Sequence, residues 1–195
     1  MHTAEITVPT FRAIAFSGSL RDGSTNTGLI RLAQRIAPHE LSIEIIDWVD
    51  ELPWMNPDLE ASPPEPVTRW WAALRAADAL IVGMPEYNGC PTGLAKNALD
   101  WATRPPDDRA IQGTVVAFLS SAGGSGGANA QENIGRVMGY VGATMVIEPP
   151  VQIKGAGSRF DAQGNTDDVE IIDAVAAKLR AVIDALTLHG ANPES

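Results

Sequence analysis

The stretch GSLRDGSTNTGL, residues 18–29, joins an apolar run to a segment with helical periodicity. A glycine-rich turn from a strand into a helix directs backbone N–H groups and the positive end of the helix dipole toward one point, which suits an anion. The turn also carries side-chain donors on Ser19, Arg21, Ser24, Thr25 and Asn26. The stretch therefore predicts a strand, an anion-binding turn and a helix in succession.

The rest of the chain repeats this alternation of strand and helix. Apolar, β-branched runs typical of buried strands occupy 11–18, 41–47, 77–84, 114–121 and 143–149. Helical periodicity marks 26–37, 67–77, 93–103, 128–141 and 169–186. Strict alternation with right-handed crossovers predicts an α/β domain, a doubly wound five-stranded parallel sheet with helices on both faces. We expect one domain over 1–195, with 1–10 and 188–195 frayed.

Three polar loops follow predicted strands, and ligands of open α/β sheets bind beyond the carboxyl ends of the strands. These loops are GSLRDGSTN (18–26), PEYNGCPTG (85–93) and SSAGGSGGAN (120–129). We expect all three at one edge of the sheet. The Pro-rich segment LPWMNPDLEASPPEP (52–66) is too short for a domain and is expected to form a long excursion after the second strand.

Composition narrows the class of partner. The formal net charge of −10 disfavours nucleic acid and anionic membranes, so a small molecule or a protein is the expected partner. Cys90 is the single cysteine, and His2, His39 and His189 show no ligand spacing, so no disulfide or metal site is expected within one chain. The start of the chain lacks the features of a signal peptide, and the apolar runs are short, so we expect a soluble cytoplasmic protein.

The turn at 18–26 leaves several local interpretations open. Gly18 and Gly23 match the first half of a Walker A loop, but Ser24 stands where the lysine belongs. Asp47 ends the second strand where a ribose-binding acid would lie in a dinucleotide fold, yet neither glycine-rich loop completes G-x-G-x-x-G. A plain helix-capping turn is the alternative without function. A lone phosphate monoester fits the turn best.

Three ordered motifs resemble the NADPH-dependent FMN reductase family, whose members are flavodoxin-like. They are GSLRxxSxN at 18–26, PEYN followed by a KNAxDW segment at 85–101, and the S-x-G-G loop at 121–124, within a match from about Phe11 to Val146. The resemblance implies an FMN phosphate held by Ser19, Arg21, Ser24 and Asn26. It places Pro85, Glu86, Tyr87 and Asn88 along the isoalloxazine, with Ser121, Gly123 and Gly124 closing the other side.

The resemblance also implies an activity. An enzyme of this family uses NAD(P)H and passes a hydride through flavin N5 to a small acceptor such as a quinone, free flavin, azo compound or metal oxyanion. Since N5 takes a hydride without a protein acid or base, no catalytic side chain is expected. The family implies a homodimer or homotetramer. Two alternatives stay open: a flavodoxin-type electron carrier that docks a protein partner, and a flavin-free nucleotide-binding Rossmann enzyme.

Overall fold

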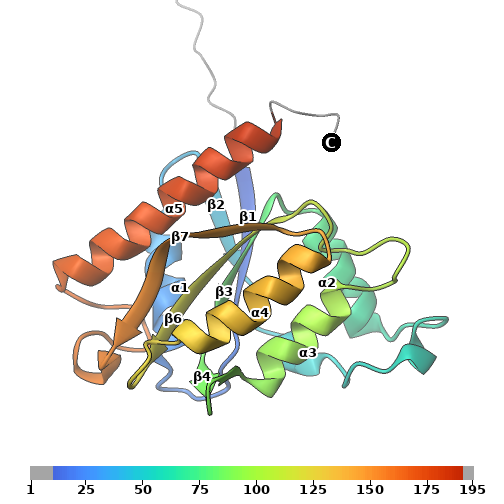
Figure 1. Cartoon of the computed structure of the whole chain (residues 1–195), viewed down its shortest axis with the longest axis horizontal. Coiled ribbons are helices and arrows are strands. Elements are labelled where there is room, and N and C mark those ends of the chain that lie inside the picture. The colour runs from blue at the N-terminus through green and yellow to red at the C-terminus, as the bar shows by residue number, and fades with distance from the viewer. Residues whose placement is uncertain (1–10, 191–195) are drawn as a thin grey trace, which may run out of the picture.

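The computed structural model describes residues 11–190, which form a five-stranded parallel sheet (Figure 1). Its strands are β1 (Phe11–Ser17), β2 (Leu41–Ile45), β3 (Ala79–Gly83), β6 (Val115–Ala122) and β7 (Thr144–Lys154). They lie in the order β2-β1-β3-β6-β7. The chain therefore reverses its direction of travel across the sheet between β1 and β3, which is the point where ligands bind in such sheets. The predicted doubly wound fold is confirmed.

Helices cover both faces of the sheet (Figure 1). One face packs against α1 (Thr25–Ile36) and α5 (Val169–Gly190), and the other packs against α2 (Glu65–Arg75), α3 (Gly93–Ala102) and α4 (Ala128–Tyr140). The expected frayed ends lie outside the described residues, except that 188–190 continue α5. Within the described range, no helix combines the length and apolar character that crossing a bilayer requires.

The two core layers follow from the alternation of side chains along each strand. In β1, Ala13 and Ala15 face the α1–α5 layer, whereas Ile14 and Phe16 face the layer under α2, α3 and α4. Each of these side chains is fully buried or nearly so. Full burial of a side chain such as Phe16 contributes about 1.5–3 kcal/mol. A strand that is apolar on both faces therefore specifies a central, covered position.

The last strand runs further than the sequence predicted. β7 pairs with β6 up to Ala117↔Val146, breaks, and resumes at Leu119↔Val151 to end at Ala122↔Lys154. Residues 147–150 form a bulge opposite Phe118, and Pro149 and Pro150 lack the N–H that a regular ladder requires. The sequence predicts that this strand ends at 149, whereas Pro149 and Pro150 lie in a bulge within it.

A short hairpin follows β3, where the sequence predicts a polar loop. β4 (Glu86–Tyr87) pairs antiparallel with β5 (Cys90–Pro91). Asn88 and Gly89 connect them with φ values of 54° and 73°. Two central residues with positive φ are typical of a type I′ hairpin turn, for which Asn-Gly is the favoured pair.

The excursion at 52–66 is fastened to α3. The Asn97 side-chain oxygen accepts the backbone N–H of Met55 at 2.8 Å, and the Trp101 indole N–H donates to the carbonyl of Pro53 at 2.8 Å. These two side chains lie four residues apart and so share one face of the helix. The segment contains the 3₁₀ turn η2 (Pro57–Leu59), after η1 (Val49–Glu51).

Candidate cofactor site

A cavity of about 440 Å³ opens at the carboxyl edge of the sheet, where the loops after β1, β3, β6 and β7 meet. Its volume lies in the range of small-molecule sites. Of the expected site residues, it is lined by Ser19, Arg21, Ser24, Asn26, Pro85, Glu86, Tyr87, Ser121 and Gly123. Asn88 and Gly124 are not among the lining residues. The three loops singled out in the sequence therefore converge on one cavity.

The loop after β1 presents donors to this cavity. Ser24 caps α1, and its hydroxyl accepts the backbone N–H of Thr27 at 3.4 Å. The N–H groups of Thr25 and Asn26 lie in the first turn of the helix, where no intrahelical acceptor exists. The Arg21 guanidinium is exposed, and no hydrogen bond or ion pair engages it within residues 11–190. A helix N-terminus beside a free guanidinium is suited to a phosphate dianion.

Asp22 stands next to Arg21 in sequence but lines a neighbouring cavity of about 410 Å³, together with Asp47. Its carboxylate therefore does not belong to the lining of the candidate cofactor cavity. Ser19 and Arg21 line both cavities, so the two cavities meet at this loop.

Asn26 has a bracing role that the sequence did not reveal. Its side-chain amide donates to the carbonyl of Ser121 and accepts the N–H of Ser121, both at 2.9 Å. Asn26 is 5% exposed, so the two bonds lie in a largely water-free setting. A third bond joins the hydroxyls of Thr25 and Ser121 at 2.8 Å. Asn26 thus fixes the loop after β1 against the end of β6.

Glu86 ties the hairpin to the N-terminus of α4. Its carboxylate accepts from the Ser125 hydroxyl at 2.6 Å, the Asn129 amide at 3.1 Å and the Ala130 backbone N–H at 3.1 Å. Desolvation by burial acts to raise the pKa of Glu86, but these hydrogen bonds outweigh it and lower the pKa below its ordinary value. Glu86 therefore stays ionised and acts as a cap for α4.

The remaining hairpin residues divide into a lining residue and a turn residue. Tyr87 lines the cavity and is 65% exposed. Asn88 is exposed and, with Gly89, forms the hairpin turn. An Asn-Gly pair is favoured in such turns, so this role needs no contact between Asn88 and a ligand. The Asn133 amide donates to the carbonyl of Gly89 at 3.0 Å, which gives the hairpin another tie to α4. The hairpin that carries Tyr87 is therefore held against α4 on both sides of Tyr87, at Glu86 and at Gly89.

The glycines show whether the cavity fits a flat ligand. A Cβ added to Gly123 or Gly157 would meet no protein atom within 4 Å, so their small size is not required by packing within the chain. In contrast, a Cβ on Gly127 would lie 2.3 Å from the Cβ of Ser120. Glycine at the open positions leaves room for close approach of a ligand to the main chain. Together with the anion donors, this room fits FMN.

A fourth wall of the cavity was missed from the sequence. It consists of Gly155, Ala156, Gly157 and Ser158, which include the 3₁₀ turn η3 (Ala156–Ser158). The sequence predicts that the fifth strand ends at 149 and does not identify this turn as part of the site. The signal was present as the glycine pair in KGAGS (154–158), directly after the true end of β7.

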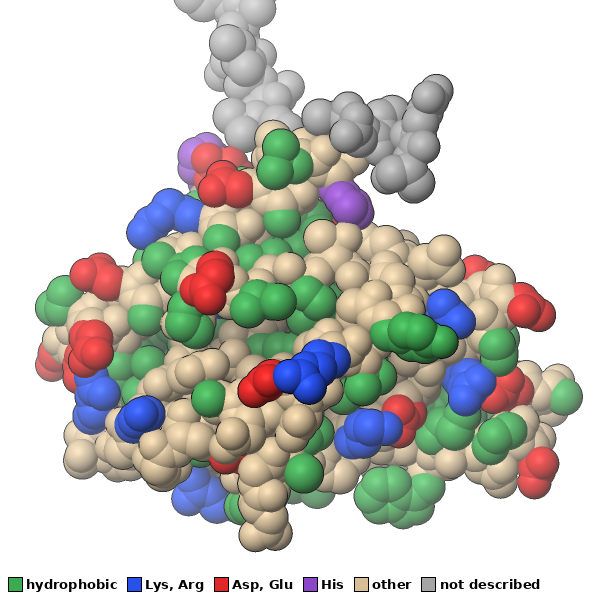
Figure 2. Space-filling model, viewed as in Figure 1, with side chains coloured by type: hydrophobic (Ala, Val, Ile, Leu, Met, Phe, Trp, Pro, Cys, Tyr) green, Lys and Arg blue, Asp and Glu red, His purple; other side chains and the backbone are tan. Residues whose placement is uncertain are grey.

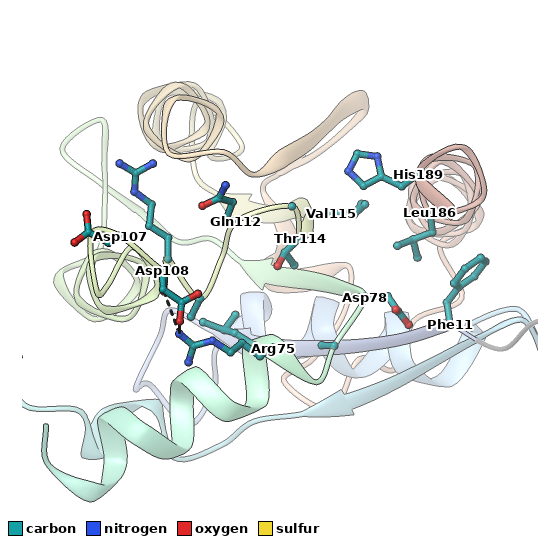
Figure 3. Close-up of a pocket in the computed structure, with 15 residues that line it drawn as sticks. Phe11, Arg75, Asp78, Asp107, Asp108, Gln112, Thr114, Val115, Leu186 and His189 are labelled. Atoms are coloured by element: carbon teal, nitrogen blue, oxygen red, sulfur yellow. Dashed lines mark hydrogen bonds and ion pairs between the residues drawn. The ribbon is translucent and has the colours of Figure 1, made fainter. Parts of the chain in front are cut away.

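A second cavity, of about 670 Å³, lies at the opposite, amino edge of the sheet (Figure 3). Three of its charged side chains, those of Arg75, Asp78 and Asp108, contact other protein groups. Arg75 pairs with Asp108 at 2.9 Å, and the Asp78 carboxylate accepts the backbone N–H of Arg12 at 2.7 Å. His189 reaches this cavity from α5, and its ring Nε2 lies 3.0 Å from the Thr144 hydroxyl. The donors expected for FMN lie at the other edge.

Comparison with known proteins agrees with this geometry. Residues 11–157 match the family described as NADPH-dependent FMN reductase. The probable NADPH:quinone oxidoreductase 2 of Oryza sativa subsp. japonica is 41% identical over 189 residues, which cover 92% of this chain and 91% of that protein. The NAD(P)H-dependent FMN reductase of Pseudomonas aeruginosa is 36% identical over 173 residues, covering 88% and 92%.

Among solved structures, FerB of Paracoccus denitrificans, a flavoenzyme NAD(P)H:(acceptor) oxidoreductase, superimposes with a TM-score of 0.83 at 30% identity. The superposition covers 92% of this chain and 99% of that one. The chain belongs to the NADPH-dependent FMN reductase family. It is an oxidoreductase with FMN as its cofactor and NAD(P)H as its co-substrate.

Proposed function

We propose that this protein oxidises NAD(P)H and passes the electrons through bound FMN to a small acceptor, a quinone first of all. Free flavin, azo compounds and metal oxyanions are further candidates. The observation that supports the proposal is a cavity in which phosphate donors, an exposed aromatic side chain and open glycines meet. The relatives named as quinone oxidoreductases support the choice of acceptor.

We assign roles to the residues as follows, supported by where each lies around the cavity. Ser19, Arg21, Ser24 and the first N–H groups of α1 hold the phosphate. Pro85 and Tyr87 lie along the ring, and Glu86 positions this segment through α4. Ser121, Gly123 and the 155–158 turn close the other side, while Asn26, Asn88 and Gly124 set the shape of the loops.

When bound, FMN supplies the centre that accepts and returns a hydride. The protein's own contribution is to bind, orient and shield that centre. The three donors around Glu86 stabilise its ionised form, which makes Glu86 a poor proton donor and a weak base near neutral pH. We therefore propose that neither Glu86 nor Tyr87 is needed as an acid or base, and that both act by position.

The proposal is tested by steady-state turnover. The purified holoprotein should be yellow and should oxidise many equivalents of NADPH or NADH when benzoquinone is added, with slow oxidation in its absence. Oxidation of at most one equivalent per protein, with quinone present, would instead indicate an electron carrier that needs a protein partner. A colourless protein that binds no FMN would indicate a flavin-free nucleotide-binding enzyme.

Single-turnover kinetics test the absence of an acid or base. Glu86→Gln and Tyr87→Phe should keep the rate of flavin bleaching by NAD(P)H within roughly tenfold of the parent at saturating FMN, since general acid–base catalysis contributes typically 10²–10⁴-fold. The rate should vary little between about pH 6 and 8. A thousandfold loss with FMN still bound would make that side chain a catalyst.

We also propose a homodimer or homotetramer in the cytoplasm. The exposed apolar side chains of the described residues support association, and the single cysteine suits a reducing compartment. Light scattering that shows only 20.6 kDa particles at working concentration would contradict the assembly.

A further inference from the structure

The neighbouring cavity of about 410 Å³, which Asp22 and Asp47 line, adjoins the cofactor cavity at the carboxyl edge of the sheet. Its volume lies in the range of small-molecule sites. Ser19 and Arg21 line both cavities, whereas Ser24 at the start of α1 lines only the cofactor cavity. The two cavities therefore share the loop after β1, and Arg21 borders both.

Strand pairing brings the end of β2 level with this loop. Ala15 of β1 lies opposite Ile45 of β2, and the backbone N–H of Ile46 donates to the carbonyl of Ala15 at 2.7 Å. Neighbouring strands in a sheet lie about 4.8 Å apart. Asp47 therefore comes level with Ser17, the last residue of β1, and both line the neighbouring cavity.

Part of the lining of the neighbouring cavity is apolar. Ile30, Ile46 and Val49 line it and are 1%, 5% and 4% exposed. Leu94 lines it as well and is half-buried. Leu20 is 69% exposed and lines this cavity but not the cofactor cavity. A flat base that lay against this lining would remove apolar surface from water, that of Leu20 included.

The neighbouring cavity also carries unengaged carboxylates. Asp22, Asp47 and Asp50 line it and are exposed, and within residues 11–190 none of these carboxylates accepts a hydrogen bond or forms an ion pair. On the face shown in Figure 2, acidic and basic side chains are interspersed, whereas in this cavity the three acids face only Arg21 and Arg31. Ionised carboxylates accept hydrogen bonds and donate none, so they suit hydroxyl groups and disfavour an anion.

These features define an order of chemical groups along the cavity. A phosphate suits the side beside Arg21, whose guanidinium has no partner within the described residues. Ribose hydroxyls suit Asp47, because an acid at the end of the second strand accepts from the ribose 2′-hydroxyl in dinucleotide folds. A planar base suits the apolar lining. Phosphate, ribose and base in this order make up a 5′-ribonucleotide.

We propose that the neighbouring cavity binds the adenylate half of FAD, so that this protein accepts FAD as well as FMN. The flavin phosphate remains at the first turn of α1, and the second phosphate of FAD contacts Arg21. Asp47 accepts from the hydroxyls of the adenosine ribose, and adenine lies against the apolar lining beside Leu20. The inference rests on the proposed position of the FMN phosphate and extends that site by one nucleotide.

The added nucleotide changes the charge of the ligand little. A phosphate monoester such as that of FMN carries about −1.5 to −2 at pH 7. The pyrophosphate of FAD spreads a similar total charge over two phosphates, one of which lies beside Arg21. The carboxylates around Asp47 are therefore compatible with FAD, but they disfavour an adenosine with a 2′-phosphate, which is the adenylate half of NADPH.

The test is titration of the apoprotein with FAD and with FMN, followed by the flavin absorbance spectrum. The wild type should bind FAD with a Kd within about tenfold of that for FMN. Asp47→Ala should raise the Kd for FAD about five- to tenfold, the effect of losing one screened hydrogen bond to a charged group, and should leave the Kd for FMN within about twofold. Asp47→Asn keeps an acceptor oxygen and should lose less FAD affinity than Asp47→Ala.

Asp107→Ala is the matched control. Asp107 is an exposed acid that lines the cavity at the amino edge of the sheet, so its loss should leave both Kd values unchanged. Circular dichroism confirms that each variant is folded. Because Asp47 is exposed and accepts no hydrogen bond within the described residues, its replacement should not disturb folding.

Two results would overturn the inference. One is a wild type that binds FMN but not FAD. The other is an Asp47→Ala variant with an unchanged ratio of the two Kd values; a raised KM for NADH in that variant would assign the cavity to the co-substrate instead. Arg21→Ala with unchanged FMN binding would contradict the proposed phosphate position itself, so the two failures are distinguishable.

Discussion

Replacement of Arg21 by alanine should weaken FMN binding through the loss of one contact to the phosphate. Arg21 lines the cofactor cavity beside Ser19 and Ser24, and within the described residues its guanidinium has no protein partner. A hydrogen bond to a charged group contributes about 1.5–3 kcal/mol. Since Arg21 is exposed and solvent screens its charge, we expect the lower end, about 1.5 kcal/mol or roughly a tenfold rise in Kd.

Titration of the apoprotein with FMN and with riboflavin, followed by flavin fluorescence, measures this effect. Riboflavin lacks the phosphate, so Arg21→Ala should leave its Kd almost unchanged. Arg31→Ala is the matched control, because Arg31 does not line the cofactor cavity and donates to the carbonyl of Ala162 at 2.8 Å. Added salt should reduce the difference between wild type and Arg21→Ala. Equal losses for FMN and riboflavin would show that this loop does not hold the phosphate.

Three further predictions concern the loops around the cavity. Gly123→Ala should leave the melting temperature unchanged but weaken FMN binding, because its Cβ would meet no protein atom. Gly127→Ala should destabilise the protein by about 2–4 kcal/mol, because Gly127 has a φ of 96° and its Cβ would lie 2.3 Å from the Cβ of Ser120. Thermal melts and flavin titrations of both variants measure these two effects. Asn26→Ala should lower the free energy of unfolding by about 2–4 kcal/mol, because it removes the side chain that pairs with the N–H and carbonyl of Ser121. Urea denaturation measures this loss, and an unchanged free energy of unfolding would contradict the bracing role of Asn26. The lowered pKa of Glu86 means that its contribution to stability is present above the unfolded value of 4.5 and is lost as pH falls through the folded pKa, so the urea midpoint of Glu86→Gln should fall less than that of wild type between pH 6 and 3.

The sequence by itself determined the order of strands and helices and the edge of the sheet at which the site lies. The runs at 13–16 and 79–84 are apolar at successive positions, which is typical of a strand covered on both faces. The polar loop at 18–26 follows such a strand and precedes a helix, so local chemistry alone predicts an anion site there. These features depend on neighbours in sequence, and sequence periodicity records them directly.

Tertiary structure decided which residues touch the cavity and which hold its walls. The sequence predicts the Asn26 amide as a phosphate donor, whereas its bonds to Ser121, 95 residues away, appear only in the folded chain because no local pattern records such a pairing. The turn at 155–158 joined the site because β7 continues through a bulge that Lys178 stabilises from another helix. Hydrogen bonds between distant segments depend on the relative placement of whole elements, and that placement is fixed by packing rather than by local propensity.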